Sequence, residues 1–420
     1  MQNLSNFDSL SQSQLQAFSQ QNPLRFLSFQ YTENDLHSFN YYTSVYKIEK
    51  RYRILKQIGF GFNPTFTAID QEYGQKVIIE VIKIENDDLI YMNQLIRQIK
   101  IENHFKHENI SSNLHIMMES KNLYIVREFI DTDLHRVNFS KQELTDDHIQ
   151  YFTYQILSAL FFLHSQNVYH TQLRLSNILL NKNCDLKISR FIGTNFPNEI
   201  YSQYITSDYF LSPQQILNLP KNLSKTDIWH VGVIILGLIN RDTFFSNLSN
   251  QLGGGYLGLI NAIFSYIGTP SGEELLQYQD YKGLYQYIIK YSKKSWQDVF
   301  PDANPLLCDL LDKMLVFNED KRYTVKECLQ HPYFEDLYDL DDIDECDVKF
   351  DHSQFQIGLN EDEIMKEIYF EVEKSYQKQQ KQKLKRYQIQ IIQNIAFQKH
   401  LADQIPLNPK LIFYNLYEDL

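Results

Sequence analysis

The hydrophobic pattern of the chain changes its period part-way along the sequence. The segments KVIIEVIKI (76–84) and LYIVREFI (123–130) are rich in β-branched and aromatic residues, as strands are. From about Asp146 the pattern becomes helical, in DDHIQYFTYQILSALFFLHSQ and later in NPLLCDLLDKMLVF. A small β-rich part followed by a larger helical part predicts an α+β fold of two lobes.

The bulk composition argues against several classes of protein. Of the 420 residues, 43% are hydrophobic, and the net charge of −12 provides no basic field for nucleic acid. The four cysteines lack C-x-x-C spacing, so we expect neither disulfides nor a zinc site, and a reducing compartment. The most apolar stretch, 231–239, is too short to span a hydrocarbon core of roughly 30 Å. The N-terminal residues lack the features of a signal peptide, so we expect no secretion and no membrane span.

The segment YHTQLRLSNILL (169–180) matches the pattern H-R-D-L-x-x-x-N at His170, Leu173 and Asn177. In the same order along the chain lie IGFGFNP, VIIE, RQIKIENHFKHENI, LKISRFIG, QYITSDYFLSPQ, TDIWHVG and DLLDKMLVFNEDKRYTVKECLQHPYF. This ordered set resembles the eukaryotic protein kinases, and within them the mitogen-activated protein kinases of the extracellular-signal-regulated type. The resemblance runs from about Tyr46 to Tyr376.

The resemblance implies a bilobal protein kinase fold, with a β-rich N-lobe and an α-helical C-lobe. VKFDHSQF and MKEIYFEVEKSYQ resemble that family's C-terminal wrap over the small lobe, followed here by a tail helix. The expected division is an irregular N-terminal extension (1–45), an N-lobe (46–132), a C-lobe (133–337), an acidic docking segment with the C-terminal wrap (338–378), and a basic helix and tail (379–420).

The positions that the resemblance assigns to catalysis carry unsuitable residues. The position of the family's phosphate-binding lysine is Glu80, and recruiting the nearby Lys83 would need a register shift. The position of the glutamate that pairs with that lysine is Gln98. The base position is Gln172, whose neutral amide cannot accept a proton. Asn177 matches a metal ligand, but the D-F-G aspartate position is Arg190, a cation that repels Mg²⁺. We therefore expect no functional catalytic residue and no binding of ATP or Mg²⁺.

The nucleotide site implied by the resemblance also has altered walls. Gly59 and Gly61 permit a close backbone approach, whereas the third glycine position is Pro64. Phe66, Ile78 and Arg127 stand at positions lining the adenine pocket and are expected to fill it, unless Arg127 points outward. Glu80 and Arg190 exchange the usual charges of the two cleft walls. Either they form a salt bridge across the cleft, or both face solvent.

The regulatory positions are altered in part. Ser202 and Tyr204 stand in the register of the phosphorylated lip, while Thr171 replaces an arginine that meets the lip phosphate. Gln214 replaces the A-P-E glutamate, and a hydrogen bond to Arg322 is expected in place of an ion pair. Asp227 begins the large buried helix and is expected to be structural.

Two segments are candidates for protein contacts. The acidic segment 336–347 matches the family's docking pair at Asp339 and Asp342, with Asp341 and Asp344 adding charge. It either attracts basic docking peptides or is a solvated linker. In the helix 379–397, Leu384, Tyr387, Ile391 and Ile395 recur at helical spacing beside basic residues. This stripe either packs on its own fold or meets a partner helix or acidic surface.

These expectations combine into a hypothesis about function. We expect a catalytically inactive, kinase-like intracellular protein, in the cytoplasm or in a cytoskeletal or nuclear assembly. It would act as a scaffold, an allosteric partner or a structural component, with the N-terminal extension as a further contact. The alternative is a low-activity or atypical serine/threonine kinase that still binds ATP.

Overall fold

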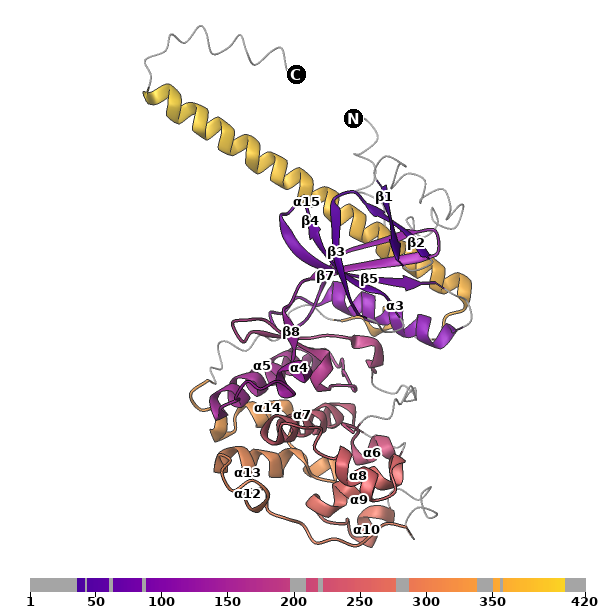
Figure 1. Cartoon of the computed structure of the whole chain (residues 1–420), viewed down its shortest axis with the longest axis vertical. Coiled ribbons are helices and arrows are strands. Elements are labelled where there is room, and N and C mark those ends of the chain that lie inside the picture. Colours follow the sequence, from indigo (N-terminus) through magenta and orange to yellow (C-terminus); the bar gives the residue numbers. More distant parts are fainter. Residues whose placement is uncertain are drawn as a thin grey trace.

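The structure is a computed structural model with two lobes, a sheet-based N-lobe and a helical C-lobe (Figure 1). It describes residues 36–41, 44–59, 63–84, 88–196, 209–217, 222–276, 287–337, 350–355 and 358–404. The switch of hydrophobic period that predicted two lobes coincides with their junction: the last strand of the N-lobe sheet ends at Glu128, and the first long helix of the C-lobe begins at Asp146.

The N-lobe is built on one antiparallel sheet in the order β3-β4-β5-β7-β6. Its strands are β3 (Tyr52–Gly59), β4 (Thr65–Asp70), β5 (Gln75–Lys83), β6 (Asn113–Glu119) and β7 (Asn122–Glu128). One face packs against α3 (Leu89–His104) through residues such as Ile82, Ile96 and Ile125. Because strand residues alternate between faces, Ile79, Val81 and Val126 form a second apolar layer on the opposite face.

That opposite face is covered by a hairpin of β1 (Leu36–Tyr41) and β2 (Ser44–Glu49). The rings of Phe39 and Tyr46 lie 5.2 and 6.4 Å from the ring of Phe66 on the sheet. The extension expected to be irregular up to residue 45 is therefore a strand from Leu36 to Tyr41. Its aromatic residues dock on the fold because they complete this apolar layer.

The C-lobe core surrounds α7, whose residues are buried on nearly every side from Lys225 to Leu238. Such a helix belongs at the centre of a lobe, as its uniformly apolar sequence indicates. The described α-helices of the C-lobe, α7 among them, are α4 (Leu134–Asn138), α5 (Asp146–Ser165), α6 (Pro213–Ile216), α7 (Leu223–Asn240), α8 (Ser246–Gln251), α9 (Gly255–Ile267), α10 (Gly272–Leu276), α12 (Trp296–Val299), α13 (Pro305–Met314) and α14 (Val325–Leu329). Local signals set several of their ends. Asn304 caps α13 just before Pro305, and Thr324 with Glu327 forms a capping box on α14.

The segment of the catalytic-loop pattern lies between the lobes. It leads into a small sheet of β8 (Thr132–Asp133), β9 (Ile178–Leu180) and β10 (Leu186–Ile188). Residues 169–177 before β9 and 189–195 after β10 run beside each other, because the backbones of Tyr169 and Asn195 hydrogen-bond in both directions.

The C-terminal wrap is confirmed. Arg97 of α3 donates from its Nε to the Phe355 carbonyl at 3.0 Å, and Asn93 accepts the backbone N–H groups of Gly358 and Leu359. The chain then forms α15 (Glu361–Gln404), which lies along the N-lobe and extends past it (Figure 1). The wrap and the basic tail helix are thus one continuous helix.

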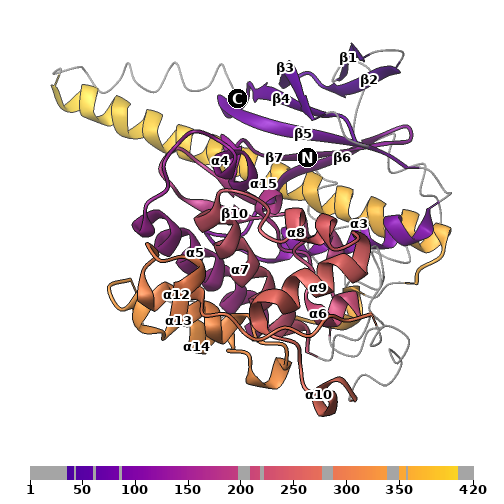
Figure 2. The same cartoon turned by 60° about the horizontal axis from the view of Figure 1, so that its bottom comes forward.

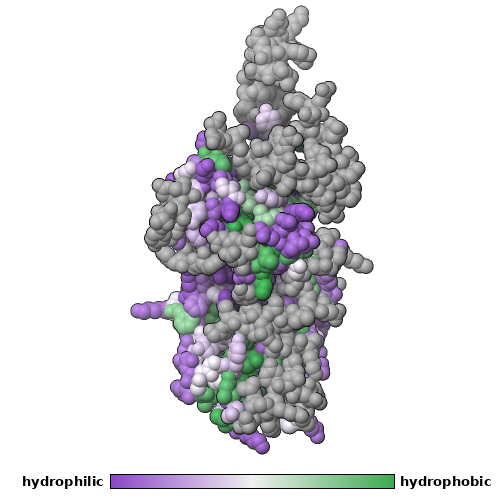
Figure 3. Space-filling model, turned by 90° about the vertical axis from the view of Figure 1, so that its right-hand side faces the viewer, coloured by the Kyte–Doolittle hydropathy of each residue, from purple (hydrophilic) through white to green (hydrophobic). Residues whose placement is uncertain are grey.

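Within the described part of the chain, no helix is long and apolar enough to cross a membrane. Among the residues that Figure 3 colours on this side, hydrophilic residues alternate with small hydrophobic patches.

Candidate functional site

The pairing of the N-lobe strands decides which side chains face the cleft. Ile78 lies opposite Arg127 of β7, and Glu80 lies opposite Ile125 of β7 and Thr65 of β4. Directly opposed residues project to the same face of a sheet, and so do residues two apart on one strand. Ile78, Glu80 and Arg127 therefore share the face that packs against α3.

Arg127 lies between two carboxylates. Its Nη1 is 2.7 Å from Glu80 Oε2, and its Nη2 is 2.9 Å from Glu102 Oε2 on α3. Its Nε also donates to the same oxygen of Glu102 at 3.2 Å. The Glu102 side chain has no exposed surface, and that of Arg127 is 15% exposed. These charge-assisted hydrogen bonds join β5, β7 and α3, and we call Glu80, Arg127 and Glu102 the ion triad.

Neutral residues complete the hydrogen bonding of the ion triad. Asn63 donates from its Nδ2 to Glu80 Oε1 at 3.0 Å and to the Tyr91 hydroxyl at 2.9 Å. Gln98 donates to Glu102 Oε1 at 3.1 Å. Gln98 therefore replaces the expected ion-pairing carboxylate with a neutral donor, one helical turn before the carboxylate that binds Arg127.

The two carboxylates of the triad respond differently to sharing one cation. Burial alone raises the pKa of Glu80, but the charge and hydrogen bonds of Arg127, with the hydrogen bond from Asn63, hold it below its ordinary value. Burial raises the pKa of Glu102 above its ordinary value, since Arg127 only partly offsets it and Glu80 adds to it. Glu80 is thus the stable anion, and Glu102 is the carboxyl that more readily holds a proton.

The salt bridge hypothesised between Glu80 and Arg190 is wrong. Both residues are described, and Glu80 forms its salt bridge with Arg127, whereas Arg190 forms none with it and only helps, at longer range, to lower its pKa. Arg190 is exposed and begins a short 3-10 turn with φ of 63°. The expectation failed because Arg127 was treated only as a residue that fills space. The signal was present in the sequence: an arginine on the strand next to Glu80, and Glu102 one turn beyond Gln98.

Phe66 was also misplaced on the adenine wall. It lies opposite Ile79, so it points to the sheet face covered by the β1–β2 hairpin, and it is 3% exposed. The residue opposite Glu80 is Thr65. A register error of one residue moves a side chain to the other face. Ile78 does share the cleft face, and Arg127 points inward.

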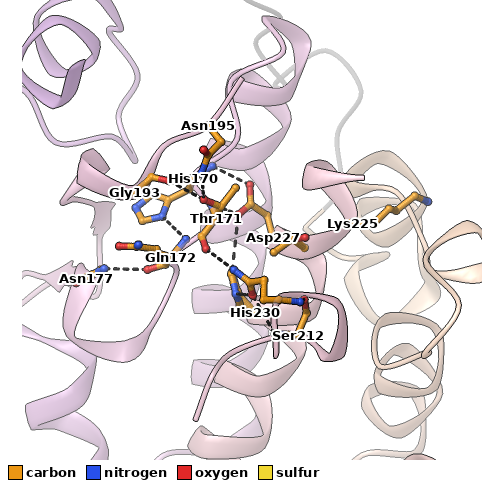
Figure 4. A network of polar contacts seen from close by, with 12 residues as sticks. His170, Thr171, Gln172, Asn177, Gly193, Asn195, Ser212, Lys225, Asp227 and His230 are labelled. Atoms are coloured by element: carbon orange, nitrogen blue, oxygen red, sulfur yellow. Dashed lines mark hydrogen bonds and ion pairs between the residues drawn. The ribbon is translucent and has the colours of Figure 1, made fainter. Parts of the chain in front are cut away.

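The catalytic-loop segment is held by Asp227 at the start of α7 (Figure 4). Its carboxylate accepts the backbone N–H of His170 at 2.9 Å and that of Thr171 at 2.7 Å. His164 also contacts it at 2.9 Å. Burial alone raises the pKa of Asp227, but the hydrogen bond from His164, with the nearby rings of His230 and His170, lowers it well below its ordinary value. Asp227 is structural, as expected.

Thr171 faces inward at the position where the motif has arginine. Its hydroxyl donates to the Gly193 carbonyl at 2.6 Å and accepts from Asn195 Nδ2 at 2.9 Å (Figure 4). Its φ of 55° is rare for a β-branched residue, so the surrounding bonds must hold it. Asn195 and Gln215, which donates to the Thr171 carbonyl at 2.9 Å, were not singled out from the sequence.

Comparison with known proteins follows this geometry. The protein kinase domain family matches residues 52–334. Over 351 residues the chain is 35% identical to extracellular signal-regulated kinase 1 of Dictyostelium discoideum, covering 81% of this chain and 65% of that protein. Over 346 residues it is 33% identical to mitogen-activated protein kinase 5 of Arabidopsis thaliana, covering 79% of this chain and 90% of that protein. The chain belongs to the protein kinase family. Its relatives are mitogen-activated protein kinases.

The polar side chains that line the cleft of this kinase-family protein contact other protein groups. Glu80 presents a carboxylate where phosphates need a cation, and its own cation is Arg127. Asn177 donates to the Gln172 carbonyl at 2.9 Å, and its amide oxygen accepts from Arg174 Nε at 3.4 Å. That oxygen therefore faces a guanidinium instead of a metal ion. Within the described segments, no group of His, Cys, Asp and Glu side chains could hold a metal.

Gln172 lies over the turn that follows Arg190. A Cβ added to Gly193 would overlap the Cγ and Cδ atoms of Gln172, so the side chain packs on the bare Cα of this glycine. His170 contacts the Ser189 carbonyl through Nε2 at 3.0 Å, and its ring lies 5.1 Å from the Phe191 ring. The loop thus keeps a kinase-like path. At the position of the catalytic base it carries Gln172, whose amide side chain packs on Gly193.

The hydrogen bond expected between Gln214 and Arg322 is confirmed. Arg322 Nη2 donates to Gln214 Oε1 at 3.1 Å, and Gln214 donates in turn to the Phe317 carbonyl. Arg322 is 1% exposed and also binds the carbonyls of Val316 and Lys225. Arg322 is therefore held in the C-lobe core with the neutral Gln214 as its partner in place of a glutamate.

The other predicted positions are only partly described. Gly59 ends β3, and the Pro64 carbonyl accepts the Val81 N–H at 2.9 Å. The positions outside the described residues are Gly61, Ser202, Tyr204, Asp339, Asp341, Asp342 and Asp344.

Proposed function

We propose that this protein is a catalytically inactive member of the kinase family that acts by binding other proteins. The observation that carries the proposal is the ion triad. Phosphoryl transfer depends on cations that neutralise and position the phosphates. Here the position of the family's phosphate-binding lysine, on β5, is the anion Glu80, and the arginine beside it is already bound by two carboxylates. An entering triphosphate would meet Glu80 and would have to compete for Arg127.

The losses at Gln172 and Arg190 support the same proposal. An amide accepts no proton at neutral pH, so the substrate hydroxyl has no base at the expected position. A guanidinium in place of a carboxylate adds positive charge where Mg²⁺ would bind. Binding of ATP is accordingly not part of the proposed function.

The retained scaffold supports a binding role. Asp227 still orders the loop, and α3 is held by Arg97, which donates to the carbonyls of Thr194 and Phe355 at 2.9 and 3.0 Å. These contacts fix the position of α3 without a nucleotide. A fold fixed in this way can present surfaces to partners as a scaffold, an allosteric partner or a structural component.

The relatives of the chain indicate which kind of partner to look for. The relatives are named as mitogen-activated protein kinases, and from this we infer protein partners inside the cell. We propose that the acidic segment 336–347 attracts basic docking peptides, because its clustered carboxylates favour Lys- and Arg-rich chains at low salt.

A phosphotransfer assay tests the proposed inactivity. The purified protein is incubated with γ-labelled ATP, with Mg²⁺ or Mn²⁺, and with a Ser/Thr-rich peptide mixture as acceptor. The matched control is the double variant Gln172→Ala, Asn177→Ala, which removes the polar groups still present in the loop. We expect no difference in transfer between the two proteins. Transfer by the native protein that disappears in the variant would show an atypical active kinase.

A further inference from the structure

The first half of α15 is packed on the N-lobe. Ile364, Ile368 and Val372 belong to the apolar layer between α3 and the sheet. Ser375 accepts the backbone N–H of Ile116 at 2.8 Å, on the edge strand β6. This part of the helix thus completes the N-lobe core.

Polar contacts then fix the helix to Arg51, just before β3, and to the turn between β4 and β5. Arg51 donates to Gln379, Lys383 lies 3.2 Å from Glu72, and the Arg386 guanidinium lies 3.9 Å from the ring centre of Tyr73. Beyond Arg386 the helix continues to Gln404 (Figures 1 and 2). At 1.5 Å per residue that further stretch is roughly 27 Å long. Figure 1 shows it leaving the body of the N-lobe.

Hydrophobic side chains lie on the outer side of this helix. Leu384 and Tyr387 are 60% and 65% exposed. Leu384 follows Ser375 by about two and a half turns, so it points away from the face that contacts the sheet. In the sequence the same helical spacing continues to Ile391 and Ile395, whose side chains lie outside the described residues. We call Leu384, Tyr387, Ile391 and Ile395 the tail seam.

The stripe either packs on its own fold or meets a partner. The exposure of Leu384 and Tyr387, whose side chains are described, favours a partner at this end of the stripe. Against the described part of the fold, Leu384 and Tyr387 stay largely exposed, whereas Gln379, Lys383 and Arg386 contact the N-lobe. A narrow stripe repeating at intervals of three and four residues is typical of a helix that pairs with another helix. Large apolar groups left in water at that spacing mark an interaction site.

The charges around the tail seam select the partner. From Lys374 to Ala402 the sequence contains no acidic residue, while Lys378 and Lys385 are exposed beside the seam. A second copy of this chain would bring the same positive charges against them in a parallel pair. Acidic residues flanking an apolar seam would instead pair with these lysines, as they do at the edges of coiled coils.

We propose that the tail seam binds an α-helix of a partner protein, with apolar residues at coiled-coil spacing and Asp or Glu on the flank that faces Lys378 and Lys385. This interface names the class of partner for the binding role proposed above. It does not depend on the state of the cleft, because α15 meets the N-lobe on α3, β6 and the β4–β5 turn.

Two synthetic helices and the full-length protein test the proposal. The first peptide carries Leu and Ile at coiled-coil spacing with Glu on both flanks, and the second has Lys in place of every Glu. Binding is measured by fluorescence anisotropy at low and at moderate salt. We expect saturable binding of the acidic peptide that weakens by tenfold or more as salt rises, and no binding of the basic peptide.

Variants of α15 assign the binding to the tail seam. Leu384→Glu with Tyr387→Glu is expected to weaken binding at least tenfold. Gln382→Glu with Gln390→Glu is the matched control, because both glutamines are exposed on the other side of the helix. The control adds the same charge and should change binding by less than threefold. If both variants lost binding of the acidic peptide equally, net charge alone would explain the loss, and the proposal would be overturned.

Other occupants are outcomes of the same test. Dimerisation in sedimentation velocity that is lost in Leu384→Glu, Tyr387→Glu would overturn the proposal in favour of a second copy. Binding to anionic phosphatidylserine vesicles, without binding to the acidic peptide, would overturn it in favour of a membrane surface. Neither result bears on phosphotransfer, so failure here is distinguishable from failure of the proposed inactivity.

Discussion

Replacing Arg127 with methionine tests the energetic role of the ion triad. Methionine retains apolar length but removes the guanidinium that lies 2.7 Å from Glu80 and 2.9 Å from Glu102. Glu102 has no exposed surface and Glu80 only 26%. Removing one partner of a buried ion pair costs about 3–5 kcal/mol, because the remaining charge stays buried without compensation. We expect a loss of that size in the N-lobe at pH 7.

The pH dependence of Arg127→Met follows from the two carboxyls. Without the cation, burial raises the folded-state pKa of both Glu80 and Glu102 above the ordinary value. A raised carboxyl pKa means stability that is full below the unfolded pKa and is lost as pH rises through the folded value. The deficit relative to the native protein is therefore larger at pH 7 than at pH 5.

A charge-free triad provides the compensating variant. Glu80→Gln, Arg127→Met, Glu102→Gln removes all three charges together, and neutral replacements of a buried triad are often well tolerated. We expect it to recover most of the lost stability. Arg53→Met is the matched control, since Arg53 is exposed on β3 of the same sheet, and should lie within about 0.5 kcal/mol of the native protein.

The assay must report on the N-lobe itself. Both tryptophans, Trp229 and Trp296, are buried in the C-lobe, so their fluorescence reports that lobe. Hydrogen exchange of β5 and α3 amides under native conditions gives the local opening free energy instead. A loss below about 1 kcal/mol in Arg127→Met, or a triple variant as unstable as the single one, would refute the reasoning.

The remaining predictions concern the loop. Burial lowers the pKa of His170 to about 4, so stability that is full above pH 6.5 falls by roughly 3 kcal/mol as pH drops to 4, and His170→Phe should flatten that part of a urea-unfolding profile. Gly193→Ala should cost more stability when it is introduced into the native protein than when it is introduced into Gln172→Ala. A double-mutant cycle by thermal unfolding measures this difference. An equal loss of stability in both backgrounds would contradict the packing of Gln172 on Gly193. Asp227→Asn should cost about 3 kcal/mol in urea unfolding, because an amide group cannot accept both backbone N–H groups; a loss under 1 kcal/mol would contradict that role.

Much of the fold could be predicted from local patterns. The change of hydrophobic period located both lobes, and the ordered motifs located the loop held by Asp227. The C-terminal wrap and the Gln214–Arg322 bond followed from motif positions. The two lobes follow from the hydrophobic pattern itself, whereas the loop, the wrap and the Gln214–Arg322 bond follow from the resemblance to the mitogen-activated protein kinases.

The errors arose where strand pairing decides the outcome. Phe66 was assigned to the cleft because a one-residue difference in register could not be seen without the β4–β5 pairing. Arg127 was considered a space-filling residue because its partners, Glu80 and Glu102, come from a different strand and a helix. The β1 strand was not predicted because its aromatic residue Phe39 packs against Phe66, a contact that is visible only once the sheet is formed.

A thermal-shift titration with ATP, with and without Mg²⁺, tests the central claim most directly. A nucleotide present at 100 times its dissociation constant would stabilise the fold by about 2.7 kcal/mol. For the kinase domain, residues 52–334, an unfolding entropy of about 2.1 cal/mol/K per residue converts this to a rise of roughly 4–5 °C in Tm. We predict no shift at millimolar ATP, because Glu80 and Arg127 already neutralise each other. A saturable, Mg²⁺-dependent shift would contradict the account.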